Sequence, residues 1–466
     1  MSSTFLFYDL ETFGLNTRYD RIAQVAAVRT DMDLNIVGPP ILLYSKLSPD
    51  YLPVPQSCLV THITPQAVNS KGMPEAEVVK ILRGEMMKPN TITLGYNTIS
   101  FDDECVRNAL YRNLYDPYER EYRNGCSRWD IINLVRATRD LRPEGLIFNK
   151  KNEQGFTSFR LTDLTEENNI EQVGAHDALV DVYATVNLAK LIKQKQPKLF
   201  SWALTHRGKD SVREVIDTVR KTPFLHTSGK FVSERGSTRP LLPLFYADKN
   251  DLYCFDLTRP LPSKIELNNY DETGIYRLQI NRCPFVAPLQ TLTSDAEKRL
   301  GFTKDEVLAK AKEALESGIF KAEDFVTSYE ESSPDTDPDL AIYGSFLSRD
   351  DKIRLEKIQS LSPRAKLLGQ QKTPFDNPKY HKLVWRHVAR NWPESLDEKE
   401  KEQWRNWCSQ RLLSPPVKDA QSINDYLYTC NELLNSLNTD GEDKETILAL
   451  IEYAEMLKKT IVKAEK

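Results

Sequence analysis

The sequence predicts a three-part protein: an α/β domain, a small β-rich domain and a helical C-terminal domain. Residues 1–197 alternate apolar strand-like runs with helical patterns, which is typical of an α/β domain. Residues 198–347 hold short β-rich runs separated by Asn, Asp, Gly and Pro, with added helices, and residues 348–466 are helical in pattern. A chain of 466 residues is too long for one core, so several domains are expected.

The individual elements follow from the same patterns. In the first domain we expect strands at 4–10, 21–30, 41–46 and 91–96. We expect helices there at 75–87, 102–114, 129–138, 161–168 and 177–194. In the second domain we expect strands at 240–246 and 252–257 and a helix at 303–317.

Composition narrows the class of protein. Apolar content of 40% and charged content of 28% describe a soluble globular chain. The sequence has neither an apolar run of about 20 residues nor the features of a signal peptide, so we expect a cytoplasmic protein with no membrane partner. Seven single cysteines without a CxxC pair favour reduced thiols over disulfides or zinc. With a net charge of −4, a nucleic-acid site must be a local basic surface.

Two carboxylates close the first predicted strand. Asp9 and Glu11 are two residues apart, and side chains at i and i+2 of a strand project from the same face. Two neighbouring anions repel, and a divalent cation is the simplest reason for placing them together. Two solvated acids at a strand end remain the alternative at this point.

Two later segments add polar groups of the same kind. Asp102 follows a turn where a helix begins, a position at which helix capping is the commoner role. His176 precedes Asp181 by five residues at another helix start, which puts Asp181 one turn into the helix, on the face that His176 can overhang. We expect the adjacent Asp103 and Asp177 to favour the helix dipole rather than to be ligands.

The order of these groups is more specific than any one of them. Asp-x-Glu, then Asn-x-x-x-Phe-Asp, then His-x-x-x-x-Asp resembles the DEDDh exonucleases. The resemblance implies that two divalent ions are held by four acids, Asp9, Glu11, Asp102 and Asp181. It also implies that His176 is the general base. Two hard cations can bind the attacking water and stabilise the leaving 3′ oxygen. Oxygen ligands suit Mg²⁺, with Mn²⁺ as a substitute, and a histidine can accept a proton at neutral pH.

Further short segments resemble bacterial exonuclease I. They are DLETFG (9–14), ITPQ (63–66), GYN (95–97), RNLYDPY (112–118), SRWD (127–130), LRPEG (141–145), SFRL (158–161), Thr205-His206-Arg207 and INRCP (280–284). This resemblance implies a ribonuclease H-like exonuclease domain, an SH3-like β-barrel domain and a helical C-terminal domain. It also implies processive 3′→5′ hydrolysis of single-stranded DNA to 5′-mononucleotides, in DNA repair and recombination, by a protein that we expect to be a monomer.

Arginines and aromatic residues alternate between positions 107 and 160, a pattern that suits phosphates and stacked bases. Solvated arginines and packed tyrosines are the alternative reading. The resemblance favours as strand contacts Arg107, Tyr118, Tyr122, Arg136 and Arg160. Thr12 and Phe13 directly follow the acids, so we expect them, with Glu11, to contact the terminal nucleotide. In the second domain, we expect Lys209 and Arg282 to continue the basic path.

The family resemblance also implies a protein partner, the acidic C-terminal tail of single-stranded-DNA-binding protein. Arg142 offers a cation for a carboxylate and Trp202 an apolar wall. Two alternatives for the function remain: a DEDDh exoribonuclease or proofreading-type exonuclease, and a non-catalytic adaptor that binds single-stranded DNA. The two additional domains argue against a stand-alone proofreading subunit, and the complete set of acids argues against an adaptor.

Overall fold

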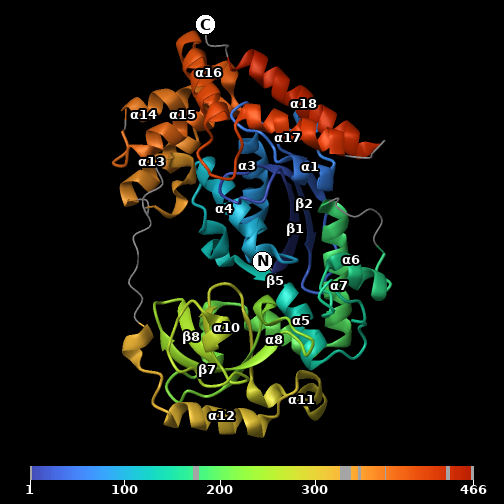
Figure 1. Cartoon of the computed structure of the whole chain (residues 1–466). Helices are drawn as coiled ribbons and strands as arrows, with labels where there is room; N and C mark the ends of the chain where they lie inside the picture. Colours follow the sequence, from blue (N-terminus) through green and yellow to red (C-terminus); the bar gives the residue numbers. More distant parts are fainter. Residues whose placement is uncertain are drawn as a thin grey trace.

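The computed structural model describes residues 3–171, 178–325, 337–344, 348–372, 374–436 and 441–462. A mixed sheet with its helices occupies the middle of the molecule, a second sheet lies below it, and a group of helices lies above it (Figure 1). The predicted fold class, an α/β domain followed by a β domain and a helical domain, is therefore confirmed. Among the described residues, no helix has the length and apolar character needed to cross a bilayer.

The first sheet has the strand order β3-β2-β1-β4-β5. Its strands are β1 (Thr4–Thr12), β2 (Ile22–Thr30), β3 (Ile41–Tyr44), β4 (Thr91–Gly95) and β5 (Ser127–Asp130). Strand β1 pairs antiparallel with β2 and parallel with β4, so it is the central strand. The four predicted strands of this domain are confirmed, and the central one is the strand that carries Asp9 and Glu11.

Helices cover both faces of this sheet. They are α7 (Ala178–Lys195) on one face, and α3 (Glu75–Met86) and α4 (Asp102–Arg112) on the other. Side chains of β1 alternate between the faces: Phe5 and Phe7 join the cluster that contains α7, and Leu6 and Tyr8 join the cluster that contains α3 and α4. Odd-numbered residues of β1 therefore point toward α7.

The helix predictions differ in outcome. The helices at 75–87, 102–114, 161–168 and 177–194 are confirmed as α3, α4, α6 (Leu161–Glu167) and α7. The helix at 129–138 is wrong at its start, because β5 takes residues up to Asp130 and α5 (Ile132–Leu141) begins after it. Trp129 pairs with Leu94 of β4, and this pairing between distant segments cannot be recognised from the short sequence of β5 alone. The short helices α1 (Pro55–Thr61) and α2 (Pro65–Lys71) were not predicted.

The second sheet is antiparallel throughout, with the order β10-β6-β7-β8-β9. Its strands are β6 (Phe224–Thr227), β7 (Thr238–Tyr246), β8 (Asp251–Asp256), β9 (Ile275–Gln279) and β10 (Phe285–Pro288). The helices nearby are α8 (Pro197–Thr205), α9 (Lys209–Val215), α10 (Tyr270–Thr273), α11 (Ser294–Leu300) and α12 (Lys304–Glu316). The predicted strands at 240–246 and 252–257 and the helix at 303–317 are confirmed.

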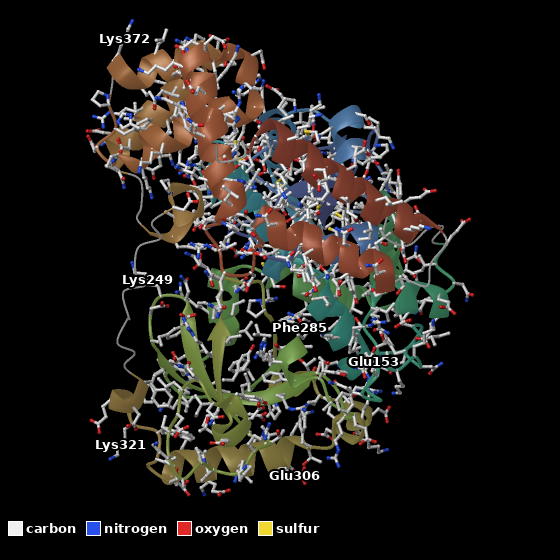
Figure 2. The ribbon with its side chains drawn as sticks, turned by 45° about the horizontal axis from the view of Figure 1, so that its top comes forward. Glu153, Lys249, Phe285, Glu306, Lys321 and Lys372 are labelled. Carbon is white, nitrogen blue, oxygen red and sulfur yellow. The ribbon has the colours of Figure 1, made fainter. Side chains whose placement is uncertain are left out.

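The second domain is docked on the first through a buried carboxylate. Asp140, at the end of α5, accepts hydrogen bonds from the backbone N–H of Ser237 and the hydroxyl of Thr238, each 2.7 Å long. In Figure 2, Glu306 and Lys321 mark the outer side of this domain, and Lys372 lies at the opposite end of the molecule.

The last part of the chain is helical. Its helices are α13 (Arg349–Gln359), α14 (Pro363–Lys372), α15 (Lys379–Asn391), α16 (Glu398–Leu413), α17 (Ile423–Ser436) and α18 (Glu442–Thr460). The side chain of Asn391 accepts a 2.8 Å hydrogen bond from the backbone N–H of Ala76, and Arg390 pairs with Asp50 at 2.9 Å. The short 3₁₀ segment Pro338–Tyr343 also docks on the first domain, which therefore lies between the other two.

Candidate metal and active site

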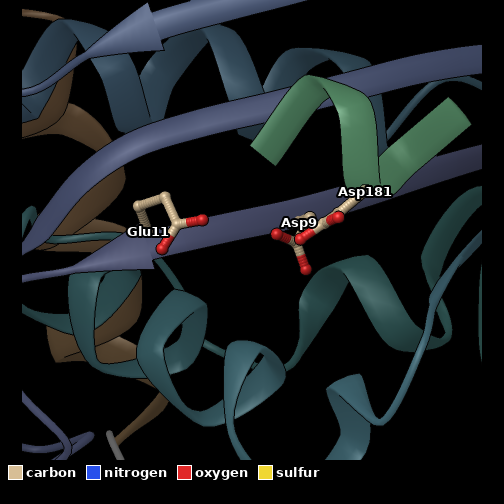
Figure 3. Close-up of side chains that lie close together, drawn as sticks. All are labelled: Asp9, Glu11 and Asp181. Atoms are coloured by element: carbon tan, nitrogen blue, oxygen red, sulfur yellow. The ribbon is translucent and has the colours of Figure 1, made fainter. Parts of the chain in front are cut away.

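Three carboxylates meet at the end of β1. Asp9 and Glu11 come from odd positions of β1, and Asp181 comes from the first turn of α7, the helix that covers that face (Figure 3). One carboxylate oxygen from each side chain lies within 4.8 Å of those from the other two. The alternation of β1 and the packing of α7 thus place three acids around one point, as the sequence predicts for these residues.

The electrostatics of this group favour a bound cation. Burial raises the pKa of Asp9 well above its usual range, and the charges of Asp102, Glu11 and Asp181 raise it further. Anions held together in this way repel unless a cation or a proton neutralises them. Three carboxylates form a donor set of hard oxygen ligands, so the residues present fit a divalent metal ion.

Asp102 lies beside the three acids but outside their group. It is the first residue of α4 and is 6% exposed, and its charge is the strongest of those that act on Asp9. It belongs to α4, which packs on the face of the sheet opposite to that covered by α7. The helix cap is Phe101, so the alternative role of Asp102 as an N-cap is not observed.

His176, the predicted general base, lies outside the described residues, as does Asp177. The structure gives no position for either residue. The role of His176 stays a prediction that rests on the sequence.

Asp103 lies in the first turn of α4, as expected, but it also has a role that the sequence did not suggest. This side chain is 2% exposed and accepts hydrogen bonds from the hydroxyl of Tyr8 at 2.5 Å, from Arg120 at 2.6 Å and from Arg128 at 2.9 Å. Burial alone would raise the pKa of Asp103, but the two guanidinium groups hold it below its usual range. Asp103 is thus a buried ion-pair centre next to the site, and no local sequence pattern pointed to these partners.

Residues Thr12 and Phe13, expected at the terminal nucleotide, are both buried. The ring of Phe13 is 1% exposed and packs in the cluster that contains Tyr19 and Tyr51. The hydroxyl of Thr12 donates to the carbonyl oxygen of Gly14 at 2.8 Å. In this conformation the ring of Phe13 contacts protein on the inside of the domain rather than open solvent.

The residues expected along the DNA strand fall into two groups. Some are engaged within the protein: Arg107 pairs with Glu104 at 2.6 Å and Glu121 at 2.7 Å, and its guanidinium lies 5.1 Å from the centre of the Tyr118 ring. Tyr122, by contrast, is 62% exposed. Its ring is therefore accessible to a base, whereas that of Tyr118 lies under a cation.

The other predicted strand contacts divide in the same way. Arg160 and Lys209 are exposed at the starts of α6 and α9. Arg136 donates to the side chain of Asn133 at 2.9 Å. Arg282 donates to the carbonyl oxygen of Ile99 at 3.2 Å, so it links the second domain to the first.

The two residues expected at the protein partner lie at the boundary of the first two domains. Arg142 donates to the carbonyl oxygen of Thr291 at 2.8 Å. The indole of Trp202 donates to the carbonyl oxygen of Val286 at 2.8 Å and stacks on His206, with ring centres 3.7 Å apart. Both side chains are partly exposed, so each keeps some surface at the domain boundary.

A mixed five-stranded sheet with carboxylates at the end of its central strand defines an exonuclease-type catalytic domain, here followed by a β domain and a helical domain. The chain matches three family models: Exonuclease over residues 6–189, Exonuclease I SH3-like domain over 207–331, and Exonuclease I C-terminal domain over 336–457. The chain therefore belongs to the exodeoxyribonuclease I family.

Individual relatives agree with this over nearly the whole chain. The exodeoxyribonuclease I of Buchnera aphidicola subsp. Schizaphis graminum is 37% identical, over 96% of this chain and 94% of that protein. A crystal structure of E. coli exonuclease I in complex with a dA16 oligonucleotide has 34% identity and a TM-score of 0.90, covering 98% of this chain and 100% of the other. A structure of SSB/exonuclease I in complex with the inhibitor CFAM has 34% identity and a TM-score of 0.88, with coverage of 98% and 100%. The resemblance to exonuclease I found in the sequence is confirmed.

Proposed function

We propose that Asp9, Glu11 and Asp181 hold the divalent metal with which this 3′→5′ exonuclease hydrolyses single-stranded DNA. The observation that carries the proposal is the convergence of their three carboxylates within 4.8 Å. The fourth acid of the two-ion set expected from the family is Asp102. Of the charges that raise the pKa of Asp9, that of Asp102 has the largest effect. When bound, the metal ions polarise the attacking water and neutralise charge on the phosphate. We propose Mg²⁺, with Mn²⁺ as a substitute, since the donors are carboxylate oxygens.

His176 is proposed as the general base that takes the proton from the attacking water. Its replacement by Ala should reduce turnover by about 10²–10⁴-fold, the usual contribution of a positioned base. A loss below about tenfold would assign His176 a structural role instead.

We propose that the strand lies along exposed groups near the site. Tyr122 offers a ring for base stacking, and Arg160 and Lys209 offer exposed cations for phosphates. Arg107, Tyr118, Arg136 and Arg282 make contacts within the protein, so their contacts with DNA would have to form beside or in place of those bonds. We also propose that Glu11 and Thr12 contact the terminal nucleotide of the strand. Phe13 joins them only if its ring leaves the core.

The partner proposal is an interaction with the acidic tail of single-stranded-DNA-binding protein at Arg142 and Trp202. A related crystal structure is described as SSB/exonuclease I in complex with the inhibitor CFAM, and both residues keep partly exposed surface here. We further propose a monomer, as expected from the sequence, and a cytoplasmic location, which free and buried cysteines favour. The domain limits 1–197, 198–347 and 348–466 are also proposals, supported by family matches at 6–189, 207–331 and 336–457.

The experiment that tests the function uses end-labelled single-stranded DNA, duplex DNA and RNA, each with Mg²⁺ or with a chelator. We expect stepwise shortening of single-stranded DNA from its 3′ end, and only with the metal. Preferential digestion of RNA would favour the exoribonuclease alternative. Binding of single-stranded DNA without hydrolysis of any substrate would favour the adaptor.

A further inference from the structure

A short turn leads from β4 into α4 and so precedes Asp102, the first residue of that helix. The turn includes the 3₁₀ segment Thr98–Ser100. The carboxylate of Asp130, at the end of β5, accepts hydrogen bonds from the backbone N–H of Asn97 at 2.9 Å and of Ile99 at 3.1 Å. Asp130 is 6% exposed, so a buried carboxylate of the first domain holds this turn.

The second domain holds the same turn through Arg282. Nη2 of Arg282 donates to the carbonyl oxygen of Ile99 at 3.2 Å, and its Nη1 donates to the side chain of Gln279 at 3.4 Å. Both backbone polar groups of Ile99 are therefore engaged by side chains, the N–H by Asp130 and the carbonyl oxygen by Arg282. Because only two residues separate Ile99 from Asp102, the bond from Arg282 restricts where Asp102 can lie.

The two residues that flank Arg282 contact Arg128 of β5. The carbonyl oxygen of Asn281 accepts a hydrogen bond from the guanidinium of Arg128 at 3.0 Å, and the thiol of Cys283 donates to the carbonyl oxygen of Arg128 at 3.3 Å. The same guanidinium donates to the carboxylate of Asp103 at 2.9 Å. The second domain is thus connected to the residues on both sides of the acid that begins α4, directly before it and through Arg128 after it.

The backbone next to Arg282 has a rare conformation. Cys283 has a φ of 49°, in the left-handed region that residues with a β-carbon seldom adopt. Such a conformation persists where the surrounding contacts enforce it, and these conformations cluster at functional sites. Cys283 is 7% exposed and is held by the bond of its thiol to β5. Its conformation therefore marks residues 281–283 as a segment whose shape is set by its contact with the first domain.

We propose that Arg282 is a positioning residue for hydrolysis: by holding the backbone of Ile99, it keeps Asp102 in its place beside the acidic site. The inference rests on the proposed function, in which Asp102 is one of the metal-site acids. A misplacement of about 1 Å in an active site can lower the rate by up to about 100-fold. The docked second domain then contributes to the hydrolytic step itself. A direct contact of Arg282 with DNA is the alternative that the test must separate from this role.

The test compares Arg282→Met, which removes the donors and keeps an apolar stem, with the unaltered protein. The rate of nucleotide release is measured at saturating single-stranded DNA with Mg²⁺, and the Kd for a labelled oligonucleotide is measured in a chelator. We expect the rate to fall at least about fivefold, while the Kd changes less than about twofold. The matched control is Arg259→Met, because Arg259 is a partly exposed arginine of the second domain that contacts Asp271. This control should change neither quantity.

Hydrogen exchange of backbone amides in the metal-free protein tests the route of the effect. Loss of the bond to Ile99 lets the turn open more often, so its N–H groups exchange faster. In Arg282→Met we expect exchange at least about threefold faster in a peptide that covers residues 96–101. In Arg259→Met the same peptide should exchange as in the unaltered protein.

The inference is wrong if Arg282→Met releases nucleotides at the normal rate, if its Kd rises as much as its rate falls, or if exchange of the turn is unchanged. A raised Kd with a normal rate would assign Arg282 to the DNA strand instead. Asp102→Asn is scored separately and should abolish hydrolysis. Normal digestion by Asp102→Asn would overturn the role of Asp102 in the proposed function. Loss of its activity together with normal digestion by Arg282→Met overturns only this inference.

Discussion

Arg128 joins the buried carboxylate of Asp103, 2.9 Å away, to the carbonyl oxygen of Asn281 in the second domain, 3.0 Å away. Asp103 also pairs with Arg120 at 2.6 Å, and both guanidinium groups are almost completely buried. The residue that follows Asp102 in α4 is thus anchored to the body of the first domain and, through Arg128, to the second. This ion-pair cluster fixes the start of α4 beside the acidic site.

Replacing Asp103 by Asn should strongly destabilise the protein. The substitution leaves two buried guanidinium groups without their shared carboxylate, which typically costs about 3–5 kcal/mol. The free energy of unfolding in urea at pH 7 measures this loss. The matched control is Asp33→Asn, whose 81%-exposed carboxylate pairs with Lys193 at the surface and should change stability by less than about 0.5 kcal/mol. Equal losses for both variants would contradict the role assigned to Asp103.

The parts of the site that could be predicted are those with a local signal. The apolar run of β1 and the spacing of Asp9 and Glu11 placed both acids on one face of a strand. Asp181 was placed one turn into a helix by its distance from the helix start, and α7 carries it to the same point. In each case the periodicity of one element determined the direction of the side chain.

The parts that could not be predicted depend on partners far away in the sequence. Asp103 is paired with residues 17 and 25 positions later, and nothing near it distinguishes it from an ordinary helix-start acid. Phe13 stands next to the acids in the sequence, but Tyr51, 38 positions later, donates a hydrogen bond to its carbonyl oxygen in the core. Such contacts follow from tertiary packing, which has no period in the sequence.

Removing one acid from the three-carboxylate group should abolish hydrolysis and stabilise the metal-free protein. Asp181→Asn relieves repulsion within the group, so we expect its unfolding temperature in a chelator to rise by about 2 °C. Mg²⁺ should raise the unfolding temperature of the unaltered protein by mass action but not that of the variant. Asp210→Asn, a change of an exposed acid in the first turn of α9, should leave both activity and the Mg²⁺ effect intact. An Asp181→Asn protein that still digests DNA would rule out the proposed metal ligands.

Stability should fall on acidification because of a buried histidine in the second sheet. Burial lowers the pKa of His226 to about 4, below its ordinary value of 6.5. Between these values the unfolded chain binds a proton that the folded protein does not, so this stabilisation is complete above pH 6.5 and is lost as the pH falls toward 4. At pH 5 the loss is about 2 kcal/mol relative to neutral pH.

The variant His226→Gln should remove this part of the pH dependence. Urea unfolding at pH 7 and pH 5 measures it as the difference in the free energy of unfolding between the two conditions. The variant is compared with His62→Gln, a change of a partly exposed histidine in the first domain. If the stability of His226→Gln falls between pH 7 and pH 5 by as much as that of the unaltered protein, His226 is not the source of the effect.

Tyr122 should contribute to binding of single-stranded DNA through its exposed ring. The side chain is 62% exposed, and loss of one base-stacking aromatic typically weakens binding by about 1–3 kcal/mol. We therefore expect Tyr122→Ala to raise the Kd for a labelled oligonucleotide by roughly tenfold or more, measured by fluorescence anisotropy in a chelator. Tyr122→Phe should bind normally, since stacking uses the face of the ring and not the hydroxyl. The matched control is Tyr428→Ala on α17, because Tyr428 is similarly exposed, at 68%, but lies in the helical domain. An equal effect of the two alanine substitutions would show that exposure of an aromatic ring, rather than its place in the first domain, decides binding.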